Sequence, residues 1–210
     1  PGGGREETWH TVAPVTLSGV DERTVVKGQE EQSIVQLVFT GPFTPTRASA
    51  VEMEALEGLL SIRLRDELRE ARSGTYVPFV SSNLSLAPGP EYTVWIGFSA
   101  DPQRVDELVE ALFAQVTDLQ ANGPSSEELA KVQEQLRRNR EEDLADNNFW
   151  LWTIEQVFTT PGQNPEDILA YGDLLASLQP ADVQAAAQRF LPQDRYARVT
   201  LFPEGYAQEP

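Results

Sequence analysis

The 210-residue chain contains no cysteine and only one histidine, His10. Without cysteine, disulfides, thiolate zinc sites and cysteine nucleophiles are all excluded. A zinc site built from two histidines and a glutamate needs a second imidazole. A Ser-His-Asp triad would have to recruit His10, and no Gly-x-Ser-x-Gly turn accompanies it. We therefore expect no metal or other cofactor in this chain and no hydrolytic activity from the chain alone.

Positive charge is also scarce, because 16 basic residues stand against 33 acidic ones and the net charge is −17. A surface of this kind repels phosphate groups, so we expect no nucleic acid as a partner. Long apolar runs are missing as well. No stretch approaches the ~20 residues that a membrane-spanning helix requires, and the sequence therefore predicts no membrane span.

The chain opens with Pro-Gly-Gly-Gly-Arg-Glu-Glu and has neither an initiator methionine nor a signal peptide. This opening predicts a fragment of a longer protein, or a linker that expression has left behind. We expect residues 1–18 to be such a linker, residues 19–204 to be one domain, and residues 205–210 to be a polar tail.

Apolar periodicity predicts the order β-β-α-β-β-α-α-α-α-β along the chain. The expected strands are residues 23–27, 33–40, 76–86, 92–98 and 196–202. The expected helices are residues 46–69, 101–122 and 125–146, with two more that begin near residues 164 and 180. Strands and helices that are partly segregated in this way indicate an α+β fold. We expect a mostly antiparallel sheet that is covered by helices on one face.

The segment Arg63–Tyr76, RLRDELREARSGTY, joins the end of a helix to the start of a strand. A leucine stripe predicts that Arg69 lies in the last helical turn, and Gly74 permits the reversal that follows. Two interpretations are open for Arg69 and Tyr76. They are either a solvated helix-terminal cation and a half-buried strand residue, or two hydrogen-bond donors that reach into a substrate cleft.

Two further stretches favour structural interpretations. Trp150 and Trp152 suggest a ligand platform, but aromatic residues at a junction between helices more often pack in the core. The charged run Arg137–Asp143 is typical of a solvated helix face with ion pairs between successive turns.

Several short motifs of the sequence together resemble one family. They are Phe39-Thr-Gly-Pro-Phe43, Leu68-Arg-Glu-Ala-Arg-Ser-Gly-Thr-Tyr76, Asn148-Phe-Trp150 and Leu201-Phe-Pro-Glu204. From about Gly19 to Glu204 the chain is similar to the last domain of an M16 (pitrilysin/insulinase-type) zinc metallopeptidase of the large bacterial kind. The resemblance implies an M16 peptidase-like domain with the fold of the LuxS/MPP-like metallohydrolases.

The resemblance also implies a role for the Arg/Tyr pair. Enzymes of this family resemble a clamshell of four homologous domains, of which the first carries the His-x-x-Glu-His zinc motif. The last contributes an arginine and a tyrosine, seven residues apart, that contact the substrate near the scissile bond. Arg69 and Tyr76 have that spacing, and the zinc motif is missing here. The implied function is a C-terminal domain that supplies catalytic contacts from Arg69 and Tyr76 and is inactive alone.

The partners that the resemblance implies are a peptide substrate and an N-terminal catalytic half, in the same longer chain or in a separate subunit. Zinc is expected on that missing half. The setting would be bacterial, either periplasmic or cytoplasmic. The alternative function is a non-catalytic M16-like scaffold or partner-binding domain. Of the four arginines of the helix, only Arg69 has the family spacing, so Arg63, Arg65 and Arg72 are expected to be solvated.

Overall fold

The computed structural model of the chain describes residues 17–70, 78–86, 88–159 and 164–206, with the backbone alone for residues 68–70. The strands are β1 (Val20–Val26), β2 (Ser33–Pro42), β3 (Phe79–Ser85), β4 (Glu91–Ala100) and β5 (Tyr196–Phe202). The helices are α1 (Ser49–Glu70), α2 (Val105–Asn122), α3 (Ser126–Ala145), α4 (Asn147–Thr159), α5 (Glu166–Ser177) and α6 (Pro180–Phe190), and a 3₁₀ turn (Pro102–Arg104) precedes α2.

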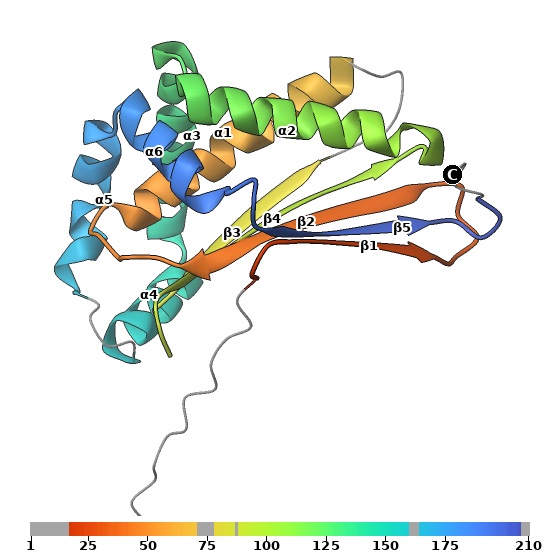
Figure 1. Cartoon of the computed structure of the whole chain (residues 1–210). Coiled ribbons are helices and arrows are strands. Elements are labelled where there is room, and N and C mark those ends of the chain that lie inside the picture. The colour runs from red at the N-terminus through yellow and green to blue at the C-terminus, as the bar shows by residue number, and fades with distance from the viewer. Residues whose placement is uncertain (1–16, 71–77, 87, 160–163, 207–210) are drawn as a thin grey trace, which may run out of the picture.

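All five strands form one sheet in the order β1-β5-β2-β4-β3. β1 pairs with β5 in parallel, whereas the other three pairings are antiparallel. The helices α1, α2 and α6 lie across one side of this sheet (Figure 1). The predicted α+β fold, with a mostly antiparallel sheet covered by helices on one face, is therefore confirmed.

Strand β2 shows how the two faces of the sheet differ. Val35, Leu37 and Phe39 are fully buried beneath the helices, whereas Ile34 and Gln36 are exposed. Because successive side chains of a strand point to opposite faces, only one face of the sheet is covered by the described residues. The helices complete the core with further fully buried leucines, namely Leu56, Leu59, Leu60, Leu64, Leu108, Leu112 and Leu119.

The helix starts that the sequence indicated are present. The Asp101 carboxylate accepts a hydrogen bond from the backbone N–H of Gln103 at 2.9 Å, at the entry to the 3₁₀ turn and α2. Ser125 and Glu128 form a reciprocal capping box at the start of α3. Both caps satisfy N–H groups that have no partner within the helix.

Helix α4 departs from the prediction, which had no helix between α3 and α5. Asp146 ends α3 in an extended conformation, and its carboxylate then accepts a hydrogen bond from the N–H of Asn148 at 2.9 Å. The helix was missed because apolar residues lie on all sides of it, so that the contrast between an apolar and a polar face is missing. The expectation of core packing is also wrong, since no residue of α4 is buried and Trp152 is 60% exposed.

Helix α4 is 13 residues long, well short of the ~20 residues that span a bilayer. No other helix within the described ranges combines the length and the apolar content needed to cross a membrane.

Candidate functional site

The predicted pair Arg69 and Tyr76 falls where α1 gives way to β3. Arg69 lies in the final turn of α1, which ends at Glu70. Its side chain and the whole of Tyr76 lie outside the described residues. The end of α1 and the start of β3, at Phe79, lie at the same end of the sheet (Figure 1). The approach of the two side chains to each other stays a prediction.

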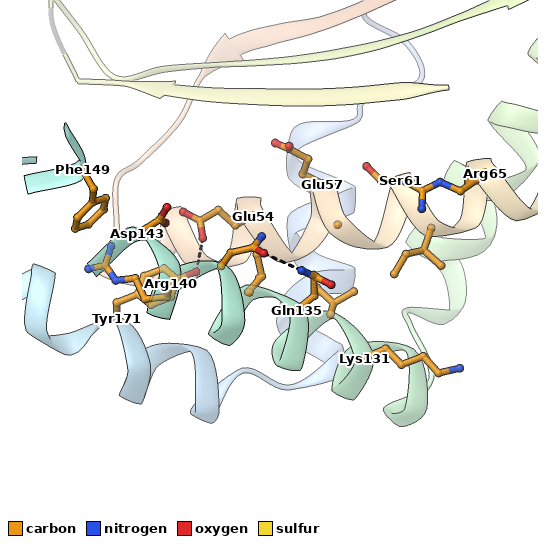
Figure 2. Close-up of a pocket in the computed structure, with 15 residues that line it drawn as sticks. Glu54, Glu57, Ser61, Arg65, Lys131, Gln135, Arg140, Asp143, Phe149 and Tyr171 are labelled. Carbon is orange, nitrogen blue, oxygen red and sulfur yellow. Dashed lines mark hydrogen bonds between the residues drawn. The ribbon is translucent and has the colours of Figure 1, made fainter. Parts of the chain in front are cut away.

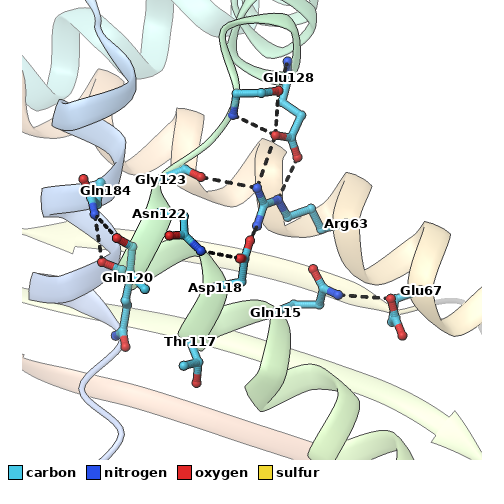
Figure 3. A network of polar contacts seen from close by, with 12 residues as sticks. Arg63, Glu67, Gln115, Thr117, Asp118, Gln120, Asn122, Gly123, Glu128 and Gln184 are labelled. Carbon is cyan, nitrogen blue, oxygen red and sulfur yellow. Dashed lines mark hydrogen bonds and ion pairs between the residues drawn. The ribbon is translucent and has the colours of Figure 1, made fainter.

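The second half of α1 is fastened to α2 and α3 through Arg63 (Figure 3). Its guanidinium donates from Nη1 to Asp118 Oδ2 at 2.7 Å, and from Nε and Nη2 to the two carboxylate oxygens of Glu128 at 2.8 and 3.2 Å. The side chain is only 11% exposed. The expectation that Arg63 is solvated is therefore wrong, because it faces the junction of the next two helices.

The Glu128 carboxylate is hydrogen-bonded both to α1 and to the start of α3. It holds Arg63 and also accepts a hydrogen bond from the backbone N–H of Ser125 at 2.8 Å. The hydrogen bonds from Arg63 lower the pKa of Glu128 to about 2, since they favour the charged form of the carboxyl group. Nearer to Arg69, Gln115 of α2 donates to the Glu67 carboxylate at 3.0 Å. The end of α1 is thus tied to its neighbours up to two residues before Arg69.

A cleft of about 640 Å³ lies along the seam between α1 and α3 (Figure 2). Its polar lining residues come mainly from these two helices and include Glu54, Glu57, Ser61, Arg65, Lys131, Gln135, Asn139, Arg140 and Asp143, with Tyr171 added from α5. The two helices approach closely here, since a Cβ added to Gly58 would lie 3.1 Å from the Val132 side chain. Sequence patterns gave no indication of this cleft.

One end of the cleft holds a partly buried hydrogen bond. The phenol of Tyr171 donates to Glu54 Oε2 at 2.5 Å. Burial raises the pKa of Glu54, and the bond from Tyr171 offsets part of that rise. Burial, followed by the neighbouring Glu54 carboxylate, also raises the pKa of Tyr171. The phenol therefore keeps its proton and remains the donor.

Arg140 lies at the same end of the cleft. Its guanidinium carbon lies 4.6 Å from the ring centroids of both Phe149 and Tyr171, and its Nη2 donates to the carbonyl oxygen of Ile168 at 2.9 Å. A cation in contact with two aromatic rings, as here, joins α3 to α4 and α5.

The prediction for the run Arg137–Asp143 holds only in part. Arg137 and Arg138 pair with Glu134 on the exposed side of α3, as expected. Arg140 and Asp143 line the cleft, and of these two Arg140 is half-buried whereas Asp143 is exposed. Arg140 comes four residues after Leu136, so it continues the apolar stripe of α3. That spacing is the signal that identifies it.

The residues of this chain do not fit a zinc centre. Within the described ranges, no group of three or more His, Cys, Asp or Glu side chains could hold a metal ion. In the cleft, Glu54 accepts a hydrogen bond from the Tyr171 phenol and Glu57 accepts one from the Ser82 hydroxyl at 2.6 Å. Zinc sites in proteins rely chiefly on histidine nitrogen and cysteine sulfur, and His10 is the only such residue in the sequence.

Comparison with known proteins gives relatives in sequence and in structure. A zinc protease PQQL-like protein of Arabidopsis thaliana is 28% identical over 194 residues, which cover 83% of this chain and 20% of the relative. The periplasmic protease PqqL from Escherichia coli superposes with a TM-score of 0.73 at 23% identity, over 89% of this chain and 21% of that one. A peptidase M16 inactive domain from Pseudomonas fluorescens gives 0.69 at 18% identity, over 91% of this chain and 45% of that one.

At these identities the two solved structures show a shared fold. The chain spans about a fifth of the length of the curated relative. The family described as the peptidase M16 inactive domain matches residues 6–136, which is more than half of the chain. This match confirms the resemblance to an M16 domain without the zinc motif, which the short sequence motifs indicated. The chain belongs to the peptidase M16 inactive domain family.

Proposed function

We propose that this chain is the non-catalytic domain of an M16 zinc endopeptidase, and that it presents Arg69 and Tyr76 to a peptide bound at a zinc site on another domain. The observation that carries the proposal is the seven-residue spacing of this pair in a member of the inactive domain family. Arg69 belongs to the last turn of α1, and the helix is anchored through Arg63 and Glu67 shortly before that turn.

The two side chains suit the charge that develops during peptide hydrolysis. As the peptide carbonyl is attacked, negative charge gathers on its oxygen, and donors fixed near that point lower the barrier. Arg69 would supply a permanent positive charge, and Tyr76 would supply a phenolic O–H. Since the chain lacks zinc ligands, the metal would be held elsewhere in the enzyme, by the N-terminal catalytic half.

The proposed domain comprises residues 19–204, with residues 1–18 as a linker and residues 205–210 as a tail. Its partners are the catalytic half, in the same longer polypeptide or in a separate subunit, and a peptide substrate. A site completed from two halves forms only when they close around the substrate, which protects against hydrolysis of the wrong protein.

The alternative is a scaffold that holds a partner and has no part in the chemistry. The cleft between α1 and α3, with its charged lining, is the observation that favours this second function. In that case, substitution of any of the four arginines of α1 and the following segment would have the same effect on peptide turnover.

Kinetics of the complete enzyme separate the two functions. Tyr76→Phe and Arg69→Ala are measured with a quenched-fluorescence peptide, alongside thermal melts of each variant. Loss of one such donor lowers kcat by as much as about 10²–10³-fold in well-formed sites, and we expect kcat/KM to fall with an unchanged melting temperature. Arg69→Lys restores only part of the activity, because the ammonium group lacks the planar fork of arginine.

Arg65→Ala is the matched control, since Arg65 is an exposed arginine one turn earlier on the same helix. It should leave turnover unchanged. If Arg69→Ala and Tyr76→Phe are as active as Arg65→Ala in an enzyme with a proven zinc site, the pair is structural and the scaffold function is preferred.

A further inference from the structure

Helix α4 carries an apolar surface that its own domain leaves uncovered. Leu151 is 64% exposed, Ile154 47% and Phe158 79%. These residues are three and four positions apart, so they form one stripe along the helix. Trp152, beside the stripe, is 60% exposed. We call these four residues the outer face of α4.

The other side of α4 accounts for its attachment to the domain. Phe149 and Trp150 are half-buried. Phe149 contacts the Arg140 guanidinium, and the indole N–H of Trp150 donates to the carbonyl oxygen of Leu144 at 3.0 Å. The inward side is therefore already occupied, and the outer face has no role in holding α4 to α3.

An uncovered face of this composition needs an explanation. Four large apolar side chains are exposed on a helix of 13 residues whose one charged residue is Glu155. Exposed apolar patches of this kind mark contact surfaces more often than isolated apolar residues do. A helix of this length is also marginal in water without packing to stabilise it.

Charge and length indicate what covers the outer face. A second copy of the chain would bring together two molecules that each carry a net charge of −17, which opposes association. By contrast, the curated relative is about five times as long as the stretch that this chain matches, and the Pseudomonas fluorescens structure has slightly more than half of its length outside the match. These two relatives thus carry further polypeptide beside the domain described here.

We infer that the outer face of α4 is the contact surface for an adjoining domain of the same longer polypeptide, which covers Leu151, Trp152, Ile154 and Phe158 by apolar packing. The inference rests on that part of the proposed function which joins this chain to a further domain, and it is independent of Arg69 and Tyr76. The Cα positions of α4 need not change on contact, because the exposed stripe already lies on one side of a formed helix.

The absence of cysteine from the chain allows a direct test. Leu151→Cys is introduced into the full-length protein, and its reaction with N-ethylmaleimide is followed by peptide mass spectrometry in native buffer and in urea. Glu110→Cys is the matched control, because Glu110 is exposed on α2. We expect the native-to-unfolded ratio of labelling rates to be about tenfold or more lower for Leu151→Cys than for the control, since burial slows access to reagent.

Equal ratios for the two variants would show an open outer face and overturn the inference. So would protection of Leu151→Cys that disappears on dilution, because it would identify a second copy as the cover. Peptide turnover by Arg69→Ala in the same full-length protein is read separately. Protection at Leu151→Cys together with wild-type turnover by Arg69→Ala would support the inference and contradict the proposed function.

Discussion

Arg63 and Glu128 form a two-point contact, in which Nε and Nη2 of the guanidinium donate to Oε1 and Oε2 of the carboxylate at 2.8 and 3.2 Å. The two residues are 65 positions apart in the sequence. The contact joins the middle of α1 to the first turn of α3, where Glu128 also belongs to the capping box. A parallel pair of charge-assisted hydrogen bonds fixes direction as well as distance.

Arg63→Ala should destabilise the domain. It removes bonds to Glu128 and Asp118 and leaves both carboxylates without their cation. Hydrogen bonds to charged groups contribute about 1.5–3 kcal/mol, but Asp118 is 49% exposed, so we expect a net loss of about 2 kcal/mol in the free energy of unfolding. Urea titration measures it. Arg65→Ala should change this free energy by less than about 0.5 kcal/mol, and equal losses in the two variants would contradict the assignment.

The contact between Arg63 and Glu128 predicts that the stability of the domain depends on pH. The folded state lowers the pKa of Glu128 to about 2 from the ordinary value of 4.5. A carboxyl group with a lowered pKa contributes stability that is present above its unfolded pKa and is lost as the pH falls through its folded pKa. The melting temperature should therefore fall between about pH 4.5 and pH 2, and Glu128→Gln should reduce this fall.

Thermal melts between about pH 4.5 and pH 2 compare the wild type with Glu128→Gln. Glu110→Gln is the control for loss of an exposed carboxylate. At neutral pH Glu128→Gln should melt below the wild type, and near pH 2 the two curves should converge. A difference that stays constant with pH would mean that the Glu128 side chain acts through packing.

Features that depend on neighbouring residues in sequence were predictable. The Ser125–Glu128 capping box lies within four residues, and the leucine stripe of α1 repeats every three or four positions, so both are visible as local patterns. Strand β2 and strand β5 were predicted from their apolar, β-branched content, and the structure confirms them within two residues.

Contacts between distant residues were not predictable in this way. Arg63 looks like any other arginine of α1, and only the packing of α2 and α3 against that helix brings Asp118 and Glu128 to it. Arg140 was misassigned for a related reason. Its spacing from Leu136 marks it as part of the apolar stripe of α3, but the two rings that contact it come from α4 and α5 and are brought to it only by the fold. The exposed side of α4 shows the converse, an apolar sequence that its own domain does not bury.

The chain alone should bind no stoichiometric zinc. Its only imidazole is His10 and it has no thiol, whereas zinc sites use three or four protein ligands, mostly of these two kinds. Metal analysis of the 210-residue chain after dialysis against zinc-containing buffer tests this expectation. One zinc per chain that survives a second, metal-free dialysis would contradict it.

The hydrogen bond between Tyr171 and Glu54 gives a prediction with a distinct pH signature. Tyr171→Phe removes the donor at 2.5 Å from the Glu54 carboxyl group and leaves that group in a partly buried site without it. A buried acceptor that loses its partner costs about 1–3 kcal/mol. Tyr206→Phe is the control, because Tyr206 packs through its ring, whose centroid lies 4.7 Å from that of Phe202, and this change should be nearly neutral.

The size of the loss should depend on pH in a known direction. Burial raises the pKa of Glu54, so its contribution is most favourable below the unfolded pKa and declines as the pH rises through the folded pKa. The bond from Tyr171 opposes this decline by favouring the charged carboxylate. Tyr171→Phe should therefore destabilise the domain more at pH 7 than at pH 4, and the added loss should vanish when Glu54→Gln is also present. Thermal melts of the two single variants and the double variant at both pH values measure this coupling, and a loss that is equal at pH 4 and pH 7 would show that the phenol does not act on the charge of Glu54.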